Sequence, residues 1–252
     1  MQPNEKVVLV TGASRGIGKA VAEGFIDAGY RVVVAARSVE PLQALVERAE
    51  TRGTKALAVG CDVTDPESVD ALFGSIREEF GRLDVLFNNA GVSAPATPVD
   101  QLTYEQWKTV LDTNMTGVFL CTRGAVALMK DQEPRGGRII NNGSISAYAP
   151  RPFSVPYTST KHGVLGMSRA LALEGRNFDI PCSQIDIGNA ATEMAVPMAK
   201  GILQANGTVA AEPLLDLRHV VDAVLFMASL PLLVNVPNLT IMPTGMPFVG
   251  RG

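Results

Sequence analysis

Tyr157 and Lys161 are the two side chains of this sequence whose types and spacing suit acid–base chemistry. They are four residues apart, so on a helix both lie on one face, one turn from each other. A phenol has an ordinary pKa of about 10, so it needs nearby positive charge to exchange protons at neutral pH. An exposed charged pair at this spacing contributes only about 0.3–0.5 kcal/mol. The pair can therefore serve catalysis only in a water-poor cleft that holds further positive charge.

The residues around this pair predict a helix. Pro156 suits a first helical turn, and apolar and small residues then recur at helical spacing as far as Leu173. Ser144 lies thirteen residues before Tyr157, just past a strand-like segment at 137–142. We therefore expect Ser144 at the carboxyl edge of a sheet, where open α/β folds bind ligands.

Strand-like and helical segments alternate along the whole chain. Strands are predicted at 6–11, 31–35, 55–60, 83–87, 137–142, 180–187 and 239–242, and helices at 16–28, 42–52, 66–80, 103–130, 156–173 and 218–229. This alternation predicts one α/β domain over 1–252, a Rossmann-type doubly wound parallel sheet of about seven strands with helices on both faces. The Met- and Ala-rich segment 188–213 breaks the rhythm and is predicted to be a lid over the substrate.

The composition of the 252 residues argues against several classes of protein. A hydrophobic content of 46% and a charged content of 19% favour a folded core over disorder. The net charge is −3 and no basic run occurs, so no nucleic-acid partner is predicted. Scattered cysteines at 61, 121 and 182 fit a reducing compartment, and two isolated histidines predict no metal site. The apolar run at 7–10 is too short for a signal peptide or a membrane span, so we expect a cytoplasmic protein without a membrane partner.

A glycine-rich turn at 11–18 joins the first predicted strand to the first predicted helix. Its glycines follow the spacing G-x3-G-x-G, which differs from the G-x-G-x-x-G of the usual dinucleotide fingerprint. Glycines let the backbone approach a pyrophosphate, which then rests on the free N–H groups of the helix N-terminus. Tight turns also need glycine for purely structural reasons, but the position between strand and helix favours dinucleotide binding.

Five motifs, in this order, resemble those of the short-chain dehydrogenase/reductase family over nearly the whole chain. They are Thr-Gly-Ala-Ser-Arg-Gly-Ile-Gly at 11–18, Asn-Asn-Ala-Gly at 88–91, Asn114, Ser144, and Tyr157-x-x-x-Lys161. The resemblance implies an oxidoreductase that transfers a hydride between a nicotinamide cofactor and a carbonyl compound or secondary alcohol.

The same resemblance assigns catalytic roles to four residues. Tyr157 would be the acid–base residue, and Lys161 its electrostatic partner and a ligand of the nicotinamide ribose. Ser144 would hold the substrate carbonyl, and Asn114 would position a water that relays protons to Lys161. Asn114 lies inside a long predicted helix, an unfavourable place for asparagine unless its amide supports a bend or binds a partner.

The resemblance also implies a set of cofactor-binding residues. Besides Tyr157 and Lys161, they are Gly12, Ser14, Arg15, Gly16, Ile17, Gly18, Arg37, Asp62, Val63, Asn89, Ala90, Gly91, Gly188 and Thr192. Asp62 resembles the residue that accepts from the adenine amine, although it could instead cap the helix at 66–80. Gly188 and Thr192 would meet the nicotinamide carboxamide.

The end of the second strand favours NADP(H) over NAD(H). A binder of the unphosphorylated cofactor usually has Asp or Glu there, to accept from the ribose hydroxyls. Here the strand ends Val-Ala-Ala-Arg-Ser at 34–38, without a carboxylate. Arg15 and Arg37 could both reach a 2′-phosphate, for which a planar guanidinium is well suited, or both could be solvated surface residues.

Two segments depart from the family pattern. After the sixth strand the family usually has Asn-Pro-Gly, whereas this chain has Asp186-Ile187-Gly188. Near the last strand the usual Asp-Gly-Gly is missing, and an apolar tail follows at 242–250. We expect this tail to be exposed and to contact another subunit. By the family resemblance we expect a homo-oligomer, either a tetramer or a dimer.

The predicted pocket walls are 93–98, 147–155 and 190–203, and their apolar side chains favour a medium-sized, apolar ketone. Arg151 would favour a carboxylate or an acyl-carrier substrate if it faced inward. The leading hypothesis is an NADP(H)-dependent carbonyl reductase, and the alternative is a reductase of 3-oxoacyl thioesters of acyl-carrier protein or CoA. A non-catalytic cofactor-binding scaffold is the third hypothesis, but it should show a broken serine, tyrosine and lysine set, which is complete here.

Overall fold

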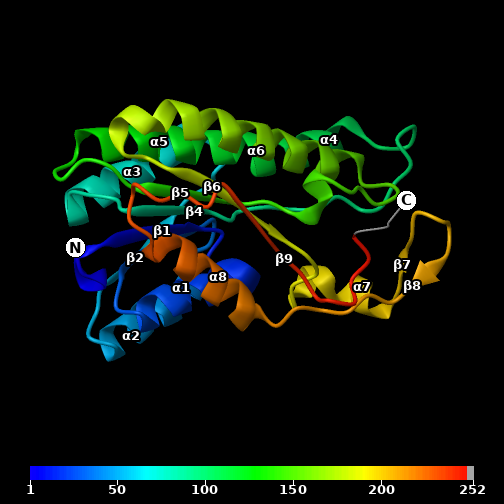
Figure 1. The fold of residues 1–252 in the computed structure, drawn as a ribbon, viewed down its shortest axis with the longest axis horizontal. Helices are drawn as coiled ribbons and strands as arrows, with labels where there is room; N and C mark the ends of the chain where they lie inside the picture. Colours follow the sequence, from blue (N-terminus) through cyan, green and yellow to red (C-terminus); the bar gives the residue numbers. More distant parts are fainter. Residues whose placement is uncertain (249–252) are drawn as a thin grey trace.

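A computed structural model of the protein describes residues 1–248. Within these residues, the main sheet has seven parallel strands in the order β3-β2-β1-β4-β5-β6-β9 (Figure 1). The strands are β1 Val7–Thr11, β2 Arg31–Ala36, β3 Ala56–Gly60, β4 Val85–Asn88, β5 Arg138–Asn142, β6 Cys182–Ile187 and β9 Asn238–Ile241. The predicted doubly wound α/β fold is confirmed.

Helices cover both faces of this sheet (Figure 1). One core lies under α1 Gly16–Asp27, α2 Gln43–Thr51 and α8 Leu217–Ser229, and the other under α3 Pro66–Phe80, α5 Gly117–Asp131 and α6 Val155–Glu174. Val8 and Val10 of β1 point into the first core, while Val7 and Leu9 point into the second, as the two-residue period of a strand requires. Because both faces are covered, the strand is apolar from Val7 to Val10.

Short local signals set the ends of the helices. The Asp65 carboxylate accepts from the Glu67 N–H at 3.1 Å and caps the start of α3. Gly81, with φ of 70°, ends the same helix in the left-handed conformation. Thr103 and Gln106 form a capping box at the start of α4 Tyr104–Leu111. These signals lie next to predicted helix boundaries, which explains the agreement at both helices.

The long helix predicted at 103–130 contains a widened turn. The chain runs through α4, then a π-helical turn at Asp112–Thr116, and then α5. The N–H of Gly117 bonds to the carbonyl of Asp112, five residues back, instead of four. Asn114 lies in this turn, so the residue expected to disturb the helix lies where the helix widens.

The order of the strands reverses beside β1. From β1 the chain moves outward through β2 and β3 and then returns to β4 on the other side of β1. Open α/β sheets bind ligands at such a switch point, outside the carboxyl ends of the strands. The turn after β1 and the segment after β4 meet there, because a Cβ on Gly12 would lie 2.8 Å from the Cα of Ala90.

The segment at 188–213, which we call the lid segment, lies outside the main sheet. It contains a short turn at Glu193–Ala195, the helix α7 Val196–Lys200, and the antiparallel strands β7 Ile202–Leu203 and β8 Val209–Ala210. Figure 1 shows α7 and the β7–β8 hairpin beyond the end of the sheet that lies opposite the N-terminus. The lid segment therefore lies near the carboxyl ends of the strands, where the sequence predicts the site.

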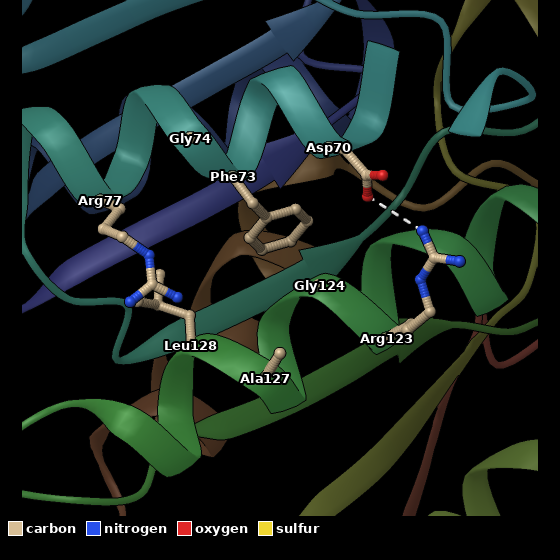
Figure 2. Close-up of a pocket in the computed structure, with 8 residues that line it drawn as sticks. All are labelled: Asp70, Phe73, Gly74, Arg77, Arg123, Gly124, Ala127 and Leu128. Carbon is tan, nitrogen blue, oxygen red and sulfur yellow. Dashed lines mark hydrogen bonds and ion pairs between the residues drawn. The ribbon is translucent and has the colours of Figure 1, made fainter. Parts of the chain in front are cut away.

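A groove between α3 and α5 is separate from that region. It is lined by Asp70, Phe73, Gly74, Arg77, Arg123, Gly124, Ala127 and Leu128 (Figure 2). An ion pair between Asp70 and Arg123, at 2.9 Å, spans the groove. None of the residues predicted for catalysis or cofactor binding lines it. The groove is a feature of helix packing.

Candidate active site

Lys161 lies on α6 and reaches the carboxyl end of β5. The residue is only 7% exposed, and its Nζ donates to the backbone carbonyl of Asn142 at 2.7 Å. The same ammonium lies 5.4 Å from the centre of the Tyr157 ring. Tyr157 is half-buried, so its phenol keeps some access to solvent. The helix thus brings a cation and a phenol together at the sheet edge, as their spacing predicts.

Ser144 follows β5 at the same edge. Its backbone N–H donates to Asp186 Oδ1 at 2.8 Å, and its Oγ accepts from the Ser146 N–H at 3.1 Å. A hydroxyl has one proton to donate and two lone pairs to accept with. Within residues 1–248 no acceptor takes the Ser144 hydroxyl proton. That proton can therefore be donated to a bound substrate.

Asn114 connects the segments around the site by hydrogen bonds of its side-chain amide. Its amide oxygen accepts from the Val92 N–H at 2.8 Å, and its Nδ2 donates to the Val92 carbonyl at 2.8 Å. The same Nδ2 lies 3.4 Å from the hydroxyl of Thr160, the residue before Lys161. The amide thus ties the π turn to the segment after β4 and to α6. Its role in positioning a water stays a prediction.

The glycine-rich turn packs closely against the segment after β4. Gly12 has φ of 64° and Gly16 has φ of 56°, in the left-handed region that favours glycine. Asn89 Nδ2 donates to the carbonyls of Thr11 and Gly12, at 2.9 and 3.2 Å. A Cβ on Gly18 would collide with both the Gly12 carbonyl and the Asn89 amide. Gly12 and Gly18 are thus required by the fold itself, whatever the turn binds.

The other predicted cofactor residues border the same region. Ser14 and Ile17 are half-buried in the turn, and Val63 is buried against Gly117 of α5. A Cβ on Gly91 would lie 3.3 Å from the Asn114 amide oxygen. These small and apolar residues bring the ends of β1, β3 and β4 close together.

Arg15 and Arg37, predicted to bind a 2′-phosphate, lie in different surroundings. Arg15 forms an exposed ion pair with Glu193 of the lid segment, with 3.4 Å between Nη1 and Oε2. Arg37 is exposed and lies near Asp62. Hydrogen bonds from the backbone and hydroxyl of Thr64, together with the Arg37 charge, hold the pKa of Asp62 below its ordinary value. Asp62 forms a turn with Thr64, so the alternative in which it caps α3 is wrong.

The C-terminal tail packs against the turn after β6. Met246 is 5% exposed, and its sulfur lies 3.4 Å from the Asn189 N–H. A Cβ on Gly188 would lie 2.8 Å from both Met242 Cβ and Met246 Sδ. The prediction of an exposed tail is therefore wrong at Met246, because this side chain fills space inside its own subunit. The residues at 249 and 250 lie outside the described part of the chain.

Thr192 lies beside the glycine-rich turn. A Cβ on Gly16 would lie 3.3 Å from the Thr192 methyl group, and the Thr192 hydroxyl lies 3.4 Å from the Ala190 carbonyl. Ile187, which replaces the family's proline, is 5% exposed and packs into the first core. The fold thus brings together the two ends of the predicted cofactor site that are far apart in the sequence.

A buried ion pair joins the loop after β5 to the end of the lid segment. Arg151 Nη2 donates to Glu212 Oε2 at 2.6 Å and to Asn189 Oδ1 at 3.0 Å. The Asn189 and Gln204 amides donate to the same carboxylate at 2.7 and 2.9 Å. Burial alone would raise the pKa of Glu212, but hydrogen bonds from Gln204, Asn189 and Arg151 lower it from the ordinary 4.5. Arg151 therefore does not offer an uncompensated charge to a substrate carboxylate.

Sequence reasoning missed two features of this region. The Arg151–Glu212 pair joins residues 61 positions apart, and no local pattern indicates it. Asp186, fully buried on β6 and bonded to the Ser144 N–H, stands out in the sequence only as part of a departure from the family pattern. A carboxylate inside a buried strand is rare, and that rarity is the signal that could have identified it.

The comparison with protein families settles the class of the protein. A family model described as short chain dehydrogenase matches residues 6–202. The chain belongs to this family. It is therefore an oxidoreductase of the short-chain dehydrogenase type, a family that binds nicotinamide cofactors.

Among characterised relatives, a 3beta-hydroxysteroid dehydrogenase of Mediterraneibacter gnavus is 38% identical over 182 residues, which cover 72% of this chain and 65% of the relative. A 3-oxoacyl-acyl-carrier-protein reductase of Synechocystis sp. is 38% identical over 201 residues, covering 79% of this chain and 80% of the relative. The two relatives are named for different substrates, so identity at this level does not choose between a steroid and a thioester.

Solved structures share the fold over nearly the whole chain. An alcohol dehydrogenase of Thermococcus sibiricus, complexed with 5-hydroxy-NADP, has a TM-score of 0.81 and 26% identity, covering 94% of this chain and 95% of that one. A 3-ketoacyl-(acyl-carrier-protein) reductase of Brucella melitensis, complexed with NADH, has a TM-score of 0.82 and 26% identity, covering 94% and 96%. Both cofactor types therefore occur among similar structures.

The described residues contain neither a cluster of metal ligands nor a candidate membrane span. Within residues 1–248, no three His, Cys, Asp or Glu side chains gather as metal ligands would. Over the same residues, no helix is long and apolar enough to cross a bilayer.

Proposed function

We propose that the protein is an NADP(H)-dependent oxidoreductase that transfers a hydride between the nicotinamide and a carbonyl compound or secondary alcohol. The observation that carries the proposal is the convergence of Ser144, Tyr157 and Lys161 at the end of β5. In the direction of reduction, Ser144 donates a hydrogen bond to the substrate carbonyl oxygen, and Tyr157 gives that oxygen its proton. The Lys161 ammonium stabilises the negative charge that the phenolic oxygen then carries.

The residues after β1 fit a dinucleotide. Gly16 begins α1 with a left-handed backbone, and the first N–H groups of a helix have no partner within it. When bound there, the cofactor supplies or accepts the hydride. Asp62 and Val63 would border its adenine, Lys161 its nicotinamide ribose, and Gly188 and Thr192 its carboxamide. The backbone of Asn89, Ala90 and Gly91 would pass close to its middle.

The preference for NADP(H) rests on the end of β2. No carboxylate stands there to accept from ribose hydroxyls, and Arg37 is exposed just past the strand. Arg15 can leave its exposed pair with Glu193 at little energetic cost, because such pairs contribute little. Arg37→Asp should shift the ratio of kcat/KM values from NADPH toward NADH. An unchanged ratio would refute the proposed role of Arg37.

The activity itself is tested by following NADPH oxidation with a panel of ketones, aldehydes and keto-esters. Tyr157→Phe should lower kcat by about 10²–10⁴-fold, because loss of a general acid–base typically has this effect. NADPH binding, followed by fluorescence, should stay near normal in this variant. A kcat of Tyr157→Phe equal to that of wild type would exclude Tyr157 as the proton donor.

The lid segment favours a neutral substrate. Met194 and Val196 of the lid and Phe153 of the preceding loop are exposed apolar side chains, while the Arg151 charge is compensated by Glu212. The second candidate, a 3-oxoacyl-thioester reductase, is favoured by the similarity to the Synechocystis and Brucella reductases. Parallel assays with acetoacetyl thioesters and free ketones separate the two. No turnover of any carbonyl compound would favour a cofactor-binding scaffold instead.

A homo-oligomer, either a dimer or a tetramer, is also part of the proposal. Its support comes from α5 and α6, where Phe119 and Leu173 are 50% and 60% exposed, and no longer from the tail. Light scattering coupled to size exclusion would give the mass of the assembly. A monomer at micromolar concentration would contradict this part.

A further inference from the structure

Asp186 is a fully buried carboxylate next to the proposed active site. It lies near the end of β6 and is 0% exposed. Its Oδ1 accepts from the Ser144 N–H and from Gln184 Nε2, both at 2.8 Å, and its Oδ2 accepts from Asn238 Nδ2 at 2.6 Å. Within residues 1–248 no Lys, Arg or His side chain forms an ion pair with it. Three neutral N–H groups and the hydroxyl of Tyr148 therefore hold it.

This arrangement is unfavourable for stability alone. A buried carboxylate loses its hydration, and neutral donors compensate for that loss less well than a cation does. The backbone at Gly143 also passes so close to this carboxylate that a Cβ there would collide with Asp186 Oδ1. Such features tend to be kept where function requires them. On the active-site side the carboxylate contacts the backbone of Ser144 and the hydroxyl of Tyr148.

Asp186 and the Ser146 N–H together hold the backbone and the side-chain oxygen of Ser144. Asp186 Oδ1 holds the backbone N–H of Ser144, and the Ser146 N–H holds the Ser144 Oγ. With both groups held, the hydroxyl proton is left to point away from the loop. Hydrogen bonds to an ionised acceptor are shorter and stronger than neutral ones, so a carboxylate holds the Ser144 loop more firmly than an amide would.

The same carboxylate is linked to the helix that carries Tyr157 and Lys161. Gln184, which donates to Asp186, lies 3.2 Å from the Ser168 hydroxyl of α6, whose one proton it shares with the Val164 carbonyl at 2.8 Å. Ser168 in turn accepts from Asn141 of β5 at 2.8 Å. Ser144 is thereby connected through buried side chains to α6, the helix that carries Tyr157.

We propose that Asp186 is a positioning residue that holds Ser144 in register with Tyr157 for the hydride-transfer reaction. This inference rests on the proposed oxidoreductase function. In this role Asp186 acts through the serine whose backbone it holds. Loss of its bond should lower kcat while leaving NADPH binding unchanged, because the cofactor residues do not contact it.

The test is a double-mutant cycle of Asp186→Ala and Ser144→Ala, with kcat measured at saturating NADPH and ketone. Asp186→Ala alone should lower kcat by about 10–100-fold, the equivalent of one lost hydrogen bond to a charged group. In the Ser144→Ala background the same change should lower kcat by less than about twofold, because the serine is already absent. Asp186→Asn keeps an acceptor for the Ser144 N–H, but a weaker one, so its kcat should lie between those of Asp186→Ala and wild type.

Ser183→Ala is the matched control. Ser183 is also buried on β6, but its hydroxyl bonds to Asn235 rather than to the Ser144 loop, at 2.8 Å. The control should lower stability without changing kcat. If Asp186→Ala does not fold, Asp186→Ser, whose side chain is too short to reach the Ser144 N–H, takes its place in the cycle.

Two outcomes would overturn the inference. One is an Asp186→Ala enzyme with kcat within about twofold of wild type, and the other is a loss that multiplies fully with that of Ser144→Ala. A wild-type chain without carbonyl turnover would instead refute the proposed function. In that case hydrogen exchange still tests the contact, since the Ser144 amide should exchange at least about tenfold faster in Asp186→Ala. Unchanged exchange would show that Asp186 does not hold this loop.

Discussion

Neutralising Glu212 should destabilise the protein strongly. In Glu212→Gln the Arg151 side chain, 13% exposed, loses the carboxylate that compensates its charge. Both oxygens of Glu212 accept hydrogen bonds, so the NH₂ group of the new glutamine must face one of the present donors. Breaking a buried pair by removing one partner costs about 3–5 kcal/mol. For a chain of this size each kcal/mol shifts the melting temperature by about 2–4 °C, so Tm should fall by about 6–20 °C.

Thermal and guanidinium unfolding followed by circular dichroism measure this loss, and limited proteolysis tests whether the lid segment opens first. The matched control is Glu193→Gln, the same substitution in the same segment, where the partner Arg15 and the carboxylate are both exposed. The control should change stability little. Adding Arg151→Met to Glu212→Gln should recover most of the loss, because no charge is then left buried.

The effect should also depend on pH. The folded protein holds the pKa of Glu212 below its ordinary 4.5, so the carboxylate adds stability above that pH. The advantage of wild type over Glu212→Gln should shrink as the pH falls through the lowered pKa, where both proteins carry a neutral side chain. A loss below about 1 kcal/mol at neutral pH, or one that does not vary with pH, would refute the reasoning about this pair.

Two further predictions concern the glycines that line the groove between α3 and α5 and the accessibility of the buried cysteines. Gly74→Ala should raise the free energy of unfolding by about 0.8–1 kcal/mol, because its Cβ would meet no atom within 4 Å on α3 (Figure 2). Gly124→Ala, across the same groove, should lower it by about 1–3 kcal/mol, because its Cβ would collide with the Phe73 ring; equal effects in denaturant titrations would contradict this. The cysteines at 61, 121 and 182 are all buried, and burial raises the pKa of Cys182 to about 12. A thiol reagent should therefore label them only when the chain unfolds, and rapid labelling of the native protein would show the opposite.

Local patterns were sufficient to predict the sheet, because β1 to β4 are short and largely apolar runs, and the mixed strands that follow keep the same alternation with helices. The same is true of the pair on α6, since the four-residue spacing of Tyr157 and Lys161 fixes their common face. The π turn at Asn114 could be predicted only in part. Asparagine inside a helix indicates a disturbance, but only the structure shows that its amide holds Val92.

Contacts between distant residues could not be predicted in this way. Ser144 and Asp186 are 42 positions apart, and their bond depends on β5 and β6 being neighbours in the sheet. The burial of Met246 depends on how the chain returns after β9. The prediction of an exposed tail fails at Met246, because an apolar side chain can equally cover its own subunit.

The turn after β6 shows how such contacts can replace a local constraint. Where the family pattern has a proline, this chain has Ile187, so ring rigidity does not hold the turn. Instead, the Gly188 N–H donates to the Ile241 carbonyl at 2.9 Å, and Met246 closes over Gly188 and Asn189. The Arg151–Glu212 pair holds Asn189 from the other side. The proposed nicotinamide end of the site therefore depends on the last strand, the tail and the lid segment together. A change in any of them should weaken the binding of the cofactor.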